Sequence, residues 1–288
     1  MRLGVFDGNR LAVSTGSEVI DATGLLKDVP ASPQGPLHHL LEQGRFEEIV
    51  NESSLAGAPR LDPDQVTWSA PLPRPHKILG APANYRAHVE EMNNPNTIAE
   101  WGMFLKANSS VIGPGGTVRL PYSDVRTDQE GELAIVIGKT ARNVSREEAL
   151  DYVFGYTCVL DITIRSTEDR STRKSFDTFT PLGPFVVTKD EVPDPDDLEL
   201  KCWVNGELRQ HSRTSLMIYS VPRLIEYASS VMTLLPGDVI ATGTPEGVGA
   251  LADGDRIAVE IEKVGRLEVD VTGKDAVPYE HRLGKPAA

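Results

Sequence analysis

Two glutamates one residue apart, Glu130 and Glu132, stand directly before the apolar run at residues 133–137. Side chains two residues apart on a strand point to the same face of the sheet. Two like charges this close repel each other, and burial strengthens the repulsion. We therefore expect either a cation between the two carboxylates or exposure of both carboxylates to water.

A third carboxylate, Asp161, interrupts the apolar and β-branched run at residues 152–165. An unpaired buried carboxylate is costly and otherwise takes up a proton. Glu130, Glu132 and Asp161 together would form a site of oxygen ligands without Cys or His, which suits Mg²⁺, Mn²⁺ or Ca²⁺ rather than Zn²⁺. The alternative is a solvated glutamate pair at the start of a strand and an Asp161–Arg165 ion pair.

A histidine and a glutamate, His88 and Glu91, have i, i+3 spacing in "LGAPANYRAHVEEM", which predicts a strand followed by a short helix capped by Asn84. A carboxylate that holds a histidine fixes its tautomer and raises its basicity, as a water-activating general base requires. An ordinary surface pair is the alternative interpretation.

Two loops complete the candidate chemistry. Lys174 lies in the loop at residues 165–185, where it would neutralise an anionic substrate beside a metal or simply face solvent. The Gly-rich turn in "GDVIATGTPEGVG" offers backbone amides to a carboxylate, and it is not a P-loop because no GK[ST] follows.

The elements that must position these residues are mostly strands from residue 77 onward, without a regular βαβ alternation. Two helices are predicted within this part, at 145–153 with a Ser145–Glu148 capping box and at 220–231. The pattern favours a β-rich α+β roll or barrel.

The first 72 residues have a different pattern. Two short strands surround the turn at residues 7–9, helical spacing broken by Gly44 follows at 35–53, and alternate prolines occupy 71–75. We therefore predict a small N-terminal α/β domain at 1–72 and a catalytic domain at 73–288.

Bulk properties exclude several classes of protein. The 288-residue chain is 40 % hydrophobic, which suits a packed core, and its net charge of −13 disfavours nucleic acid or an anionic membrane as partner. No membrane-spanning run or signal peptide is evident. Cys158 and Cys202 form no CxxC motif, so we expect a reduced, cytoplasmic location.

Taken together, the chain from about residue 75 to 275 resembles the fumarylacetoacetate hydrolase family. The motifs are "LGAPANYRAHVEEM", "FLKANSSVIGPGG", "EGELAIVIGKTARNVSREEALDYVFGYTCVLDITIR", "RKSFDTFTPLGPFVVT", "VNGELRQ" and "LLPGDVIATGTPEGVG". The resemblance implies a mixed β-sandwich roll with a small N-terminal α/β domain, usually a homodimer. It also implies a divalent metal, usually Mg²⁺, with Mn²⁺ or Ca²⁺ as alternatives.

The resemblance assigns roles to individual residues. The metal ligands are Glu130, Glu132 and Asp161, and the catalytic residues are His88, Glu91 and Lys174. The expected substrate-binding residues are Tyr85, Arg165, Glu168, Gln210 and Thr244.

The implied activity is hydrolysis of a carbon–carbon bond in a 1,3-diketone or acylpyruvate-type 2-oxo acid, in the catabolism of aromatic or related compounds. Two alternatives on the same metal stay open, namely decarboxylation of an oxaloacetate-like acid and isomerisation or hydration of a 2-oxo-dienoate. A metal-binding module without catalysis is a further alternative, and the presence of His88, Glu91 and Lys174 disfavours it.

One segment departs from the family pattern. Where the family often reads D-x-T-A-R-D-x-Q, this chain reads "DITIRSTE", so Ser166 and Glu168 replace an aspartate and a glutamine. An ionised glutamate only accepts hydrogen bonds and would repel a substrate carboxylate. We therefore expect a substrate without a second carboxylate and a lid of unusual shape at residues 166–173.

Overall fold

Three β-sheets form the framework of the computed structural model, which describes residues 1–27 and 32–284. Within these residues the sheets contain 12, five and three strands, so the predicted β-rich α+β fold is confirmed. In the same residues, no helix combines the length and apolar character that a bilayer crossing requires.

The largest sheet runs through the whole molecule, from the N-terminal strands to those that carry the candidate site. In spatial order, its strands are β4 (Arg60–Leu61), β3 (Val19–Asp21), β2 (Arg10–Ser14), β1 (Arg2–Phe6), β14 (Thr180–Thr188), β12 (Val153–Leu160), β11 (Gly131–Ile137), β17 (Val239–Ala241), β6 (Ile78–Gly80) and β7 (Phe104–Lys106). Two further strands pair at its side, β5 (Trp68–Ser69) with β1 and β8 (Val111–Ile112) with β14.

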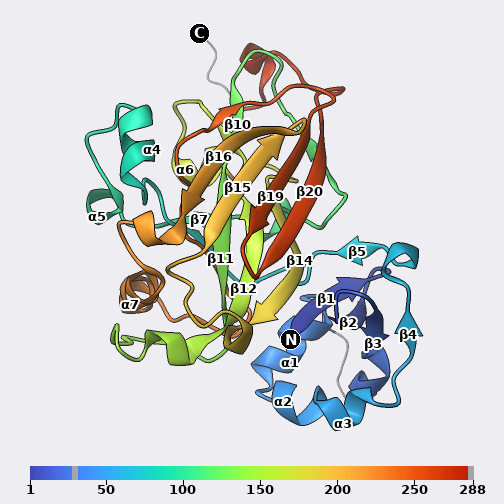
Figure 1. The fold of residues 1–288 in the computed structure, drawn as a ribbon. Coiled ribbons are helices and arrows are strands. Elements are labelled where there is room, and N and C mark those ends of the chain that lie inside the picture. The colour runs from blue at the N-terminus through green and yellow to red at the C-terminus, as the bar shows by residue number, and fades with distance from the viewer. Residues whose placement is uncertain (28–31, 285–288) are drawn as a thin grey trace.

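A five-stranded sheet packs over β11, β12 and β14 and closes a β-sandwich (Figure 1). Its strands in spatial order are β16 (Glu207–Arg213), β15 (Glu199–Val204), β19 (Arg256–Ile261), β20 (Gly265–Thr272) and β9 (Thr117–Arg119). The small sheet joins β13 (Thr163–Ile164), β10 (Thr127–Gln129) and β18 (Gly249–Ala250) next to the candidate site.

Helices occupy the periphery. The N-terminal segment contains α1 (Pro36–Glu42), α2 (Phe46–Ile49) and α3 (Glu52–Leu55). The remainder contains α4 (Arg86–Glu91), α5 (Ile98–Trp101), α6 (Arg170–Arg173) and α7 (Val221–Val231). Helices α4 and α5 lie together at one side of the sandwich, away from the N-terminal strands (Figure 1).

Strand β11 is apolar at every position from 133 to 137 because both of its faces are covered. Leu133 and Ile135 belong to the core between the two large sheets. Ala134 and Val136 belong to a second core, which the N-terminal segment closes on the opposite face. This double burial explains why the strand lacks the polar–apolar alternation of a surface strand.

The predicted division at residue 72 stays a prediction. A proline-rich segment at residues 70–77 separates β5 from β6, as expected for a boundary. However, β1 pairs antiparallel with β14, with Arg2 opposite Val187, so one continuous sheet crosses that boundary. The N-terminal segment therefore shares main-chain hydrogen bonds with the rest of the chain.

The prediction that Asn84 caps the following helix is wrong. Helix α4 begins at Arg86, and the preceding Tyr85 provides no side-chain cap. The Asn84 side chain is fully buried, donates to the carbonyls of Tyr219 and Thr242 at 3.0 and 2.7 Å, and accepts from the Tyr219 N–H at 2.7 Å. The amide joins two distant loops instead, because both offer it buried backbone partners.

The prediction of a helix at residues 145–153 is also wrong in its extent. Only a single 3₁₀ turn forms, at Ala149–Tyr152, although Ser145 Oγ does donate to Glu148 Oε2 at 3.0 Å. Strand β12 begins at Val153, and the backbone at 141–144 is bound to residues 229–234. These two constraints fix both ends of the segment, and residues 145–148 do not join the 3₁₀ turn.

Candidate metal centre and catalytic cavity

A cavity of about 220 Å³ opens beside the C-terminal end of β12 and the start of β11. Its acidic lining is Glu130, Glu132 and Asp161, and its basic lining includes Arg165 and Lys174. The further lining residues that matter to the chemistry are His88, Trp101, Phe104, Arg170, Arg173 and Thr244.

The three predicted metal ligands meet in this cavity because of the pairing between β11 and β12. Glu132 lies opposite Val159, and the Asp161 N–H donates to the Glu130 carbonyl at 2.8 Å just beyond the paired region. One carboxylate oxygen from each of the three lies within 4.8 Å of the other two. The side chains are buried, with 4 %, 3 % and 1 % of Glu130, Glu132 and Asp161 exposed.

Two buried lysines compensate part of this negative charge. Lys174 Nζ donates to Glu130 Oε2 at 2.7 Å, to Asp161 Oδ2 at 2.5 Å and to Thr163 Oγ1 at 2.6 Å. Lys106 Nζ pairs with Asp161 Oδ1 and donates to the Phe179 carbonyl at 2.9 Å. Burial opposes the charge of Lys174, but Asp161 and Glu130 outweigh it and raise its pKa. Lys174 is therefore held as an ammonium.

The carboxylates differ in how well they are compensated. Burial would raise the pKa of Glu130, but Lys174 and Arg165 outweigh that effect and lower it below the usual range. Burial and the nearby Asp161 instead raise the pKa of Glu132 well above its usual value. Glu132 accepts the Gly243 N–H at 2.8 Å, which offsets only part of that cost.

This donor set fits a hard divalent cation. It consists of three buried carboxylates whose oxygens converge, and it leaves Glu132 poorly compensated by the surrounding protein. Oxygen-only coordination is the preference of Mg²⁺, Mn²⁺ and Ca²⁺. The residues that would hold such an ion are Glu130, Glu132 and Asp161.

The alternative pairing of Asp161 with Arg165 is wrong. Arg165 Nε donates to Asp128 Oδ2 at 2.8 Å, and its Nη2 donates to Glu130 Oε1 at 2.7 Å. Asp161 is occupied by Lys106 and Lys174. Arg165 therefore supports the cluster through Glu130, and its capacity to bind substrate directly is reduced.

The predicted dyad forms on α4. His88 Nδ1 lies 3.0 Å from Glu91 Oε2, and the other Glu91 oxygen accepts the Gly247 N–H at 2.9 Å. The Gly-rich turn after β17 thus fixes the carboxylate, and the carboxylate fixes the imidazole. Because Nδ1 faces Glu91, the His88 Nε2 is the nitrogen available to the cavity.

Thr244 lines the cavity, whereas Gln210 and Tyr85 do not. Gln210 supports the site from behind, since it donates to Thr244 Oγ1 at 2.7 Å and accepts the Gly131 N–H at 2.9 Å. Tyr85 is buried, and its hydroxyl has no hydrogen-bond partner among the described residues. Substrate binding by Gln210 and Tyr85 stays a prediction.

Glu168 lies outside the cavity lining, and substrate binding by this residue stays a prediction. Its Oε1 pairs with the Tyr279 hydroxyl and with Arg282 Nη1, both near the C-terminus of the described chain. These partners neutralise the charge locally. The expectation that a second substrate carboxylate would be repelled therefore loses its basis.

The segment at 166–173 ends in α6 (Arg170–Arg173), whose N-cap Asp169 accepts the Ser171 N–H at 2.8 Å. The Arg170 guanidinium stacks over the Trp101 ring, with its carbon 3.6 Å from the ring centroid. Both residues line the cavity, so α6 and α5 form part of its wall. Movement of this segment as a lid stays a prediction.

Sequence reasoning missed several residues of the site, namely Lys106, Asp128, Arg170 and Arg173. The sequence could have indicated Lys106, because a lysine at the end of an apolar strand is unusual and is normally paired when it is buried. The indication for Arg170 and Arg173 is weaker and consists of the basic residues just before Lys174.

Comparison with known proteins agrees with this geometry. The model of the fumarylacetoacetate (FAA) hydrolase C-terminal domain matches residues 77–272. The chain is 44 % identical over 289 residues to the maleylpyruvate hydrolase of Aquipseudomonas alcaligenes, covering 94 % of this chain and 99 % of the relative. It is 36 % identical over 271 residues to a mitochondrial oxaloacetate tautomerase of Xenopus laevis, covering 89 % and 83 %.

A solved structure extends the likeness to three dimensions. It is the maleylpyruvate hydrolase of Sphingobium sp. SYK-6 in complex with manganese(II) and pyruvate, 44 % identical, with a TM-score of 0.85 over 95 % of this chain and 99 % of that one. The chain belongs to the fumarylacetoacetate hydrolase family of enzymes.

The carboxylate cluster yields a prediction for Glu132. The Glu132→Gln variant loses the negative charge but keeps an oxygen that accepts the Gly243 N–H. Its Mn²⁺ affinity should fall by more than about 100-fold, because mutation of residues that only hydrogen-bond to a metal ligand already lowers metal affinity by about 10–100-fold. Without metal, the free energy of unfolding of the variant should not fall, because the substitution removes a buried carboxylate charge that its neighbours repel. Calorimetric titration and urea unfolding measure the two quantities.

The exposed Glu147→Gln variant is the control and should leave both quantities unchanged. Wild-type Mn²⁺ affinity in Glu132→Gln would remove Glu132 from the ligand set.

Proposed function

We propose that this chain is a metal-dependent hydrolase that cleaves a carbon–carbon bond in an acylpyruvate-type 2-oxo acid and releases pyruvate and a second carboxylic acid. The observation that carries the proposal is the meeting of the three-carboxylate cluster and the His88–Glu91 dyad in one cavity. An ion site alone would serve binding, whereas a fixed imidazole beside it serves proton transfer.

The dyad supplies the nucleophile. His88 Nε2 takes a proton from water, Glu91 stabilises the imidazolium through Nδ1, and the hydroxide adds to the carbonyl carbon distal to the 2-oxo acid. The bond from that carbon to the methylene then breaks, and its electron pair leaves with the pyruvate half. The imidazolium returns the proton to that half, so one water is consumed.

The cationic groups of the cavity hold the negative charge that develops. A divalent cation held by Glu130, Glu132 and Asp161 would supply a Lewis acid that polarises a substrate oxygen. Lys174 donates to oxygens of Glu130 and Asp161, two of the three carboxylates that would hold the ion. An ion there would compete with the Lys174 ammonium for these carboxylates, and the N–H groups so released would be available to the substrate. This competition is the physical basis for Lys174 as a catalytic residue.

Oxaloacetate tautomerisation is the second candidate. It is favoured by the similarity to the tautomerase of Xenopus laevis and by a cavity that already contains a base. Tautomerisation moves one proton between carbon and oxygen and consumes no water. Product analysis therefore separates the two reactions, because only hydrolysis yields pyruvate together with a second acid.

We further propose Mg²⁺ or Mn²⁺ as the ion, a homodimer as the assembly and the cytoplasm as the location. The oxygen-only donor set supports the ion. Both cysteines are buried, and they form no disulfide in the described part of the chain, which supports a reducing compartment.

Arg170 and Arg173 provide a place for a second substrate carboxylate. Both line the cavity, and the Nε of Arg173 is buried without a hydrogen-bond partner among the described residues. Burial lowers the pKa of both guanidinium groups, and a neighbouring positive charge adds to this effect, Arg173 at Arg170 and Arg165 at Arg173, so a bound anion would relieve them. We therefore propose a dicarboxylate of maleylpyruvate type as the substrate.

Removal of the base should affect turnover far more than metal binding. His88→Ala should lower kcat by about 10²–10⁴-fold, the usual contribution of a general base, with Mn²⁺ affinity unchanged. The measurement is loss of the enol absorbance of maleylpyruvate with Mn²⁺ present, combined with pyruvate quantification. Near wild-type kcat in His88→Ala would refute the role of the dyad.

Substrate selectivity tests the arginine pair. Arg170→Gln and Arg173→Gln should each lower kcat/KM for maleylpyruvate by about 10–100-fold, since a hydrogen bond to a charged group contributes roughly 1.5–3 kcal/mol. Acetylpyruvate, which lacks the second carboxylate, should change little.

Arg223→Gln is the matched control, because Arg223 also stacks on an aromatic ring, that of Tyr219 at 4.2 Å, but does not line the cavity. Equal losses on both substrates in the Arg170 and Arg173 variants would assign the arginines a structural role only.

A further inference from the structure

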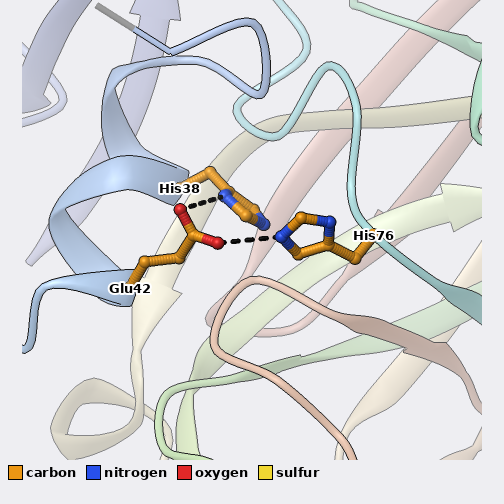
Figure 2. A group of neighbouring side chains, drawn as sticks. All are labelled: His38, Glu42 and His76. Carbon is orange, nitrogen blue, oxygen red and sulfur yellow. Dashed lines mark hydrogen bonds and ion pairs between the residues drawn. The ribbon is translucent and has the colours of Figure 1, made fainter. Parts of the chain in front are cut away.

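A second cluster of ligand-type side chains lies far from the cavity, where α1 meets the proline-rich segment before β6. It consists of His38 and Glu42 on α1 and His76 at the end of that segment. Figure 2 shows the Glu42 carboxylate beside the two imidazole rings, with a dashed line from one oxygen to each ring. The i, i+4 spacing of His38 and Glu42 puts both on one face of the helix.

The Glu42 carboxylate lies at different distances from the two imidazoles, and its short contact with His76 would have to widen for an ion to enter. His38 Nδ1 lies 3.6 Å from Glu42 Oε2, which is too long for a hydrogen bond, and His76 Nε2 lies 2.8 Å from Glu42 Oε1. One donor atom from each residue lies within 4.8 Å of the other two. Donors around a tetrahedral Zn²⁺ are about 3.3–3.5 Å apart, as ligand distances of about 2.0–2.2 Å require.

His38 is the unusual member of the cluster. Its side chain is completely buried, and neither ring nitrogen has a hydrogen-bond partner among the described residues. Buried polar atoms are normally paired, so two unpaired nitrogens on one ring need an explanation. Glu42 and His76 are half-exposed on the other side, so water and ions can reach the cluster.

The surroundings of His38 hold the ring in place but do not satisfy it. Gly237 packs so closely on the ring that a Cβ there would lie 2.2 Å from its Cδ2 atom. The nearby Asp238 is already used, since it accepts the N–H groups of Lys77 and Leu235 and pairs with the Lys77 ammonium at 2.7 Å. Asp238 is therefore no substitute partner for the imidazole.

We propose that His38, Glu42 and His76 bind a transition-metal ion, Zn²⁺ in the first place, with water as the remaining ligand. Two imidazoles and one carboxylate suit Zn²⁺, whereas the oxygen-only centre in the cavity suits Mg²⁺ or Mn²⁺. The ion gives one of the two unpaired His38 nitrogens a partner. It also joins α1 to the segment that leads into β6, and so fastens the N-terminal segment to the catalytic part.

This site does not depend on the proposed reaction, and its test is independent of activity. Zn²⁺ is titrated into the chelator-treated full-length chain that carries Glu132→Gln, so that the carboxylate centre competes less. We expect a Zn²⁺ site whose affinity falls at least about tenfold when His76→Gln or Glu42→Gln is added. Both positions are partly exposed, so these variants should fold, which buried His38 does not guarantee.

Two further readouts separate this site from an oxygen-only centre. Co²⁺ in place of Zn²⁺ should give visible ligand-field bands of a low-symmetry nitrogen-containing site, and His76→Gln should abolish them. The midpoint of thermal unfolding should rise with Zn²⁺ only in chains with an intact cluster, because the ion binds the folded state.

The matched control is His211→Gln. His211 Nε2 lies 2.8 Å from Glu199 Oε1, the same distance as between His76 and Glu42, but no second imidazole accompanies it. This variant should keep the Zn²⁺ affinity and the Co²⁺ bands. Unchanged Zn²⁺ affinity in His76→Gln, or no Zn²⁺ binding in the parent chain, would overturn the proposal and leave the cluster a hydrogen-bonded pair beside a buried ring.

Discussion

The mutual repulsion of Glu130, Glu132 and Asp161 is the constraint on which the rest of the site depends. Three carboxylates that converge in a buried place cannot all stay charged unless cations lie against them. Lys106 and Lys174 provide two such cations, and Arg165 provides a third against Glu130. Glu132 forms no ion pair with a basic side chain among the described residues, and burial and the nearby Asp161 raise its pKa. A divalent ion would give the Glu132 carboxylate the cation that it lacks.

The fold holds these groups together by surrounding them with strands. Glu132 lies on β11, Glu130 directly precedes that strand, and Asp161 directly follows β12. The pairing of the two strands therefore keeps the three carboxylates together. The Gly-rich turn after β17 contributes the Gly243 N–H to Glu132 and the Gly247 N–H to Glu91. One loop thus positions both the metal centre and the catalytic base, which explains why they share a cavity.

Patterns over a few residues predicted much of this site. The spacing of Glu130 and Glu132, the polar break at Asp161, and the i, i+3 pair on α4 are local features. Their geometry follows from strand and helix periods. The hairpin of β1 and β2 and the helix α7 were likewise predictable from turn residues and apolar spacing.

The errors concern partners that are distant in sequence. Glu168 pairs with Tyr279 and Arg282, more than a hundred residues away, and Asn84 joins loops at 219 and 242. The Arg165–Asp161 pair looked natural from four-residue spacing, but tertiary contacts give each residue other partners. The types of neighbouring residues do not show which charged side chain, distant in the sequence, the fold brings into contact with a given residue.

The most direct test of the central claim is anomalous diffraction from crystals of the full-length wild-type chain grown with Mn²⁺, with data collected near the manganese absorption edge. The account predicts one strong anomalous peak in the cavity, within coordination distance of an oxygen from each of Glu130, Glu132 and Asp161. A cavity without a peak at saturating Mn²⁺, with Lys106 and Lys174 still on the carboxylates, would contradict it.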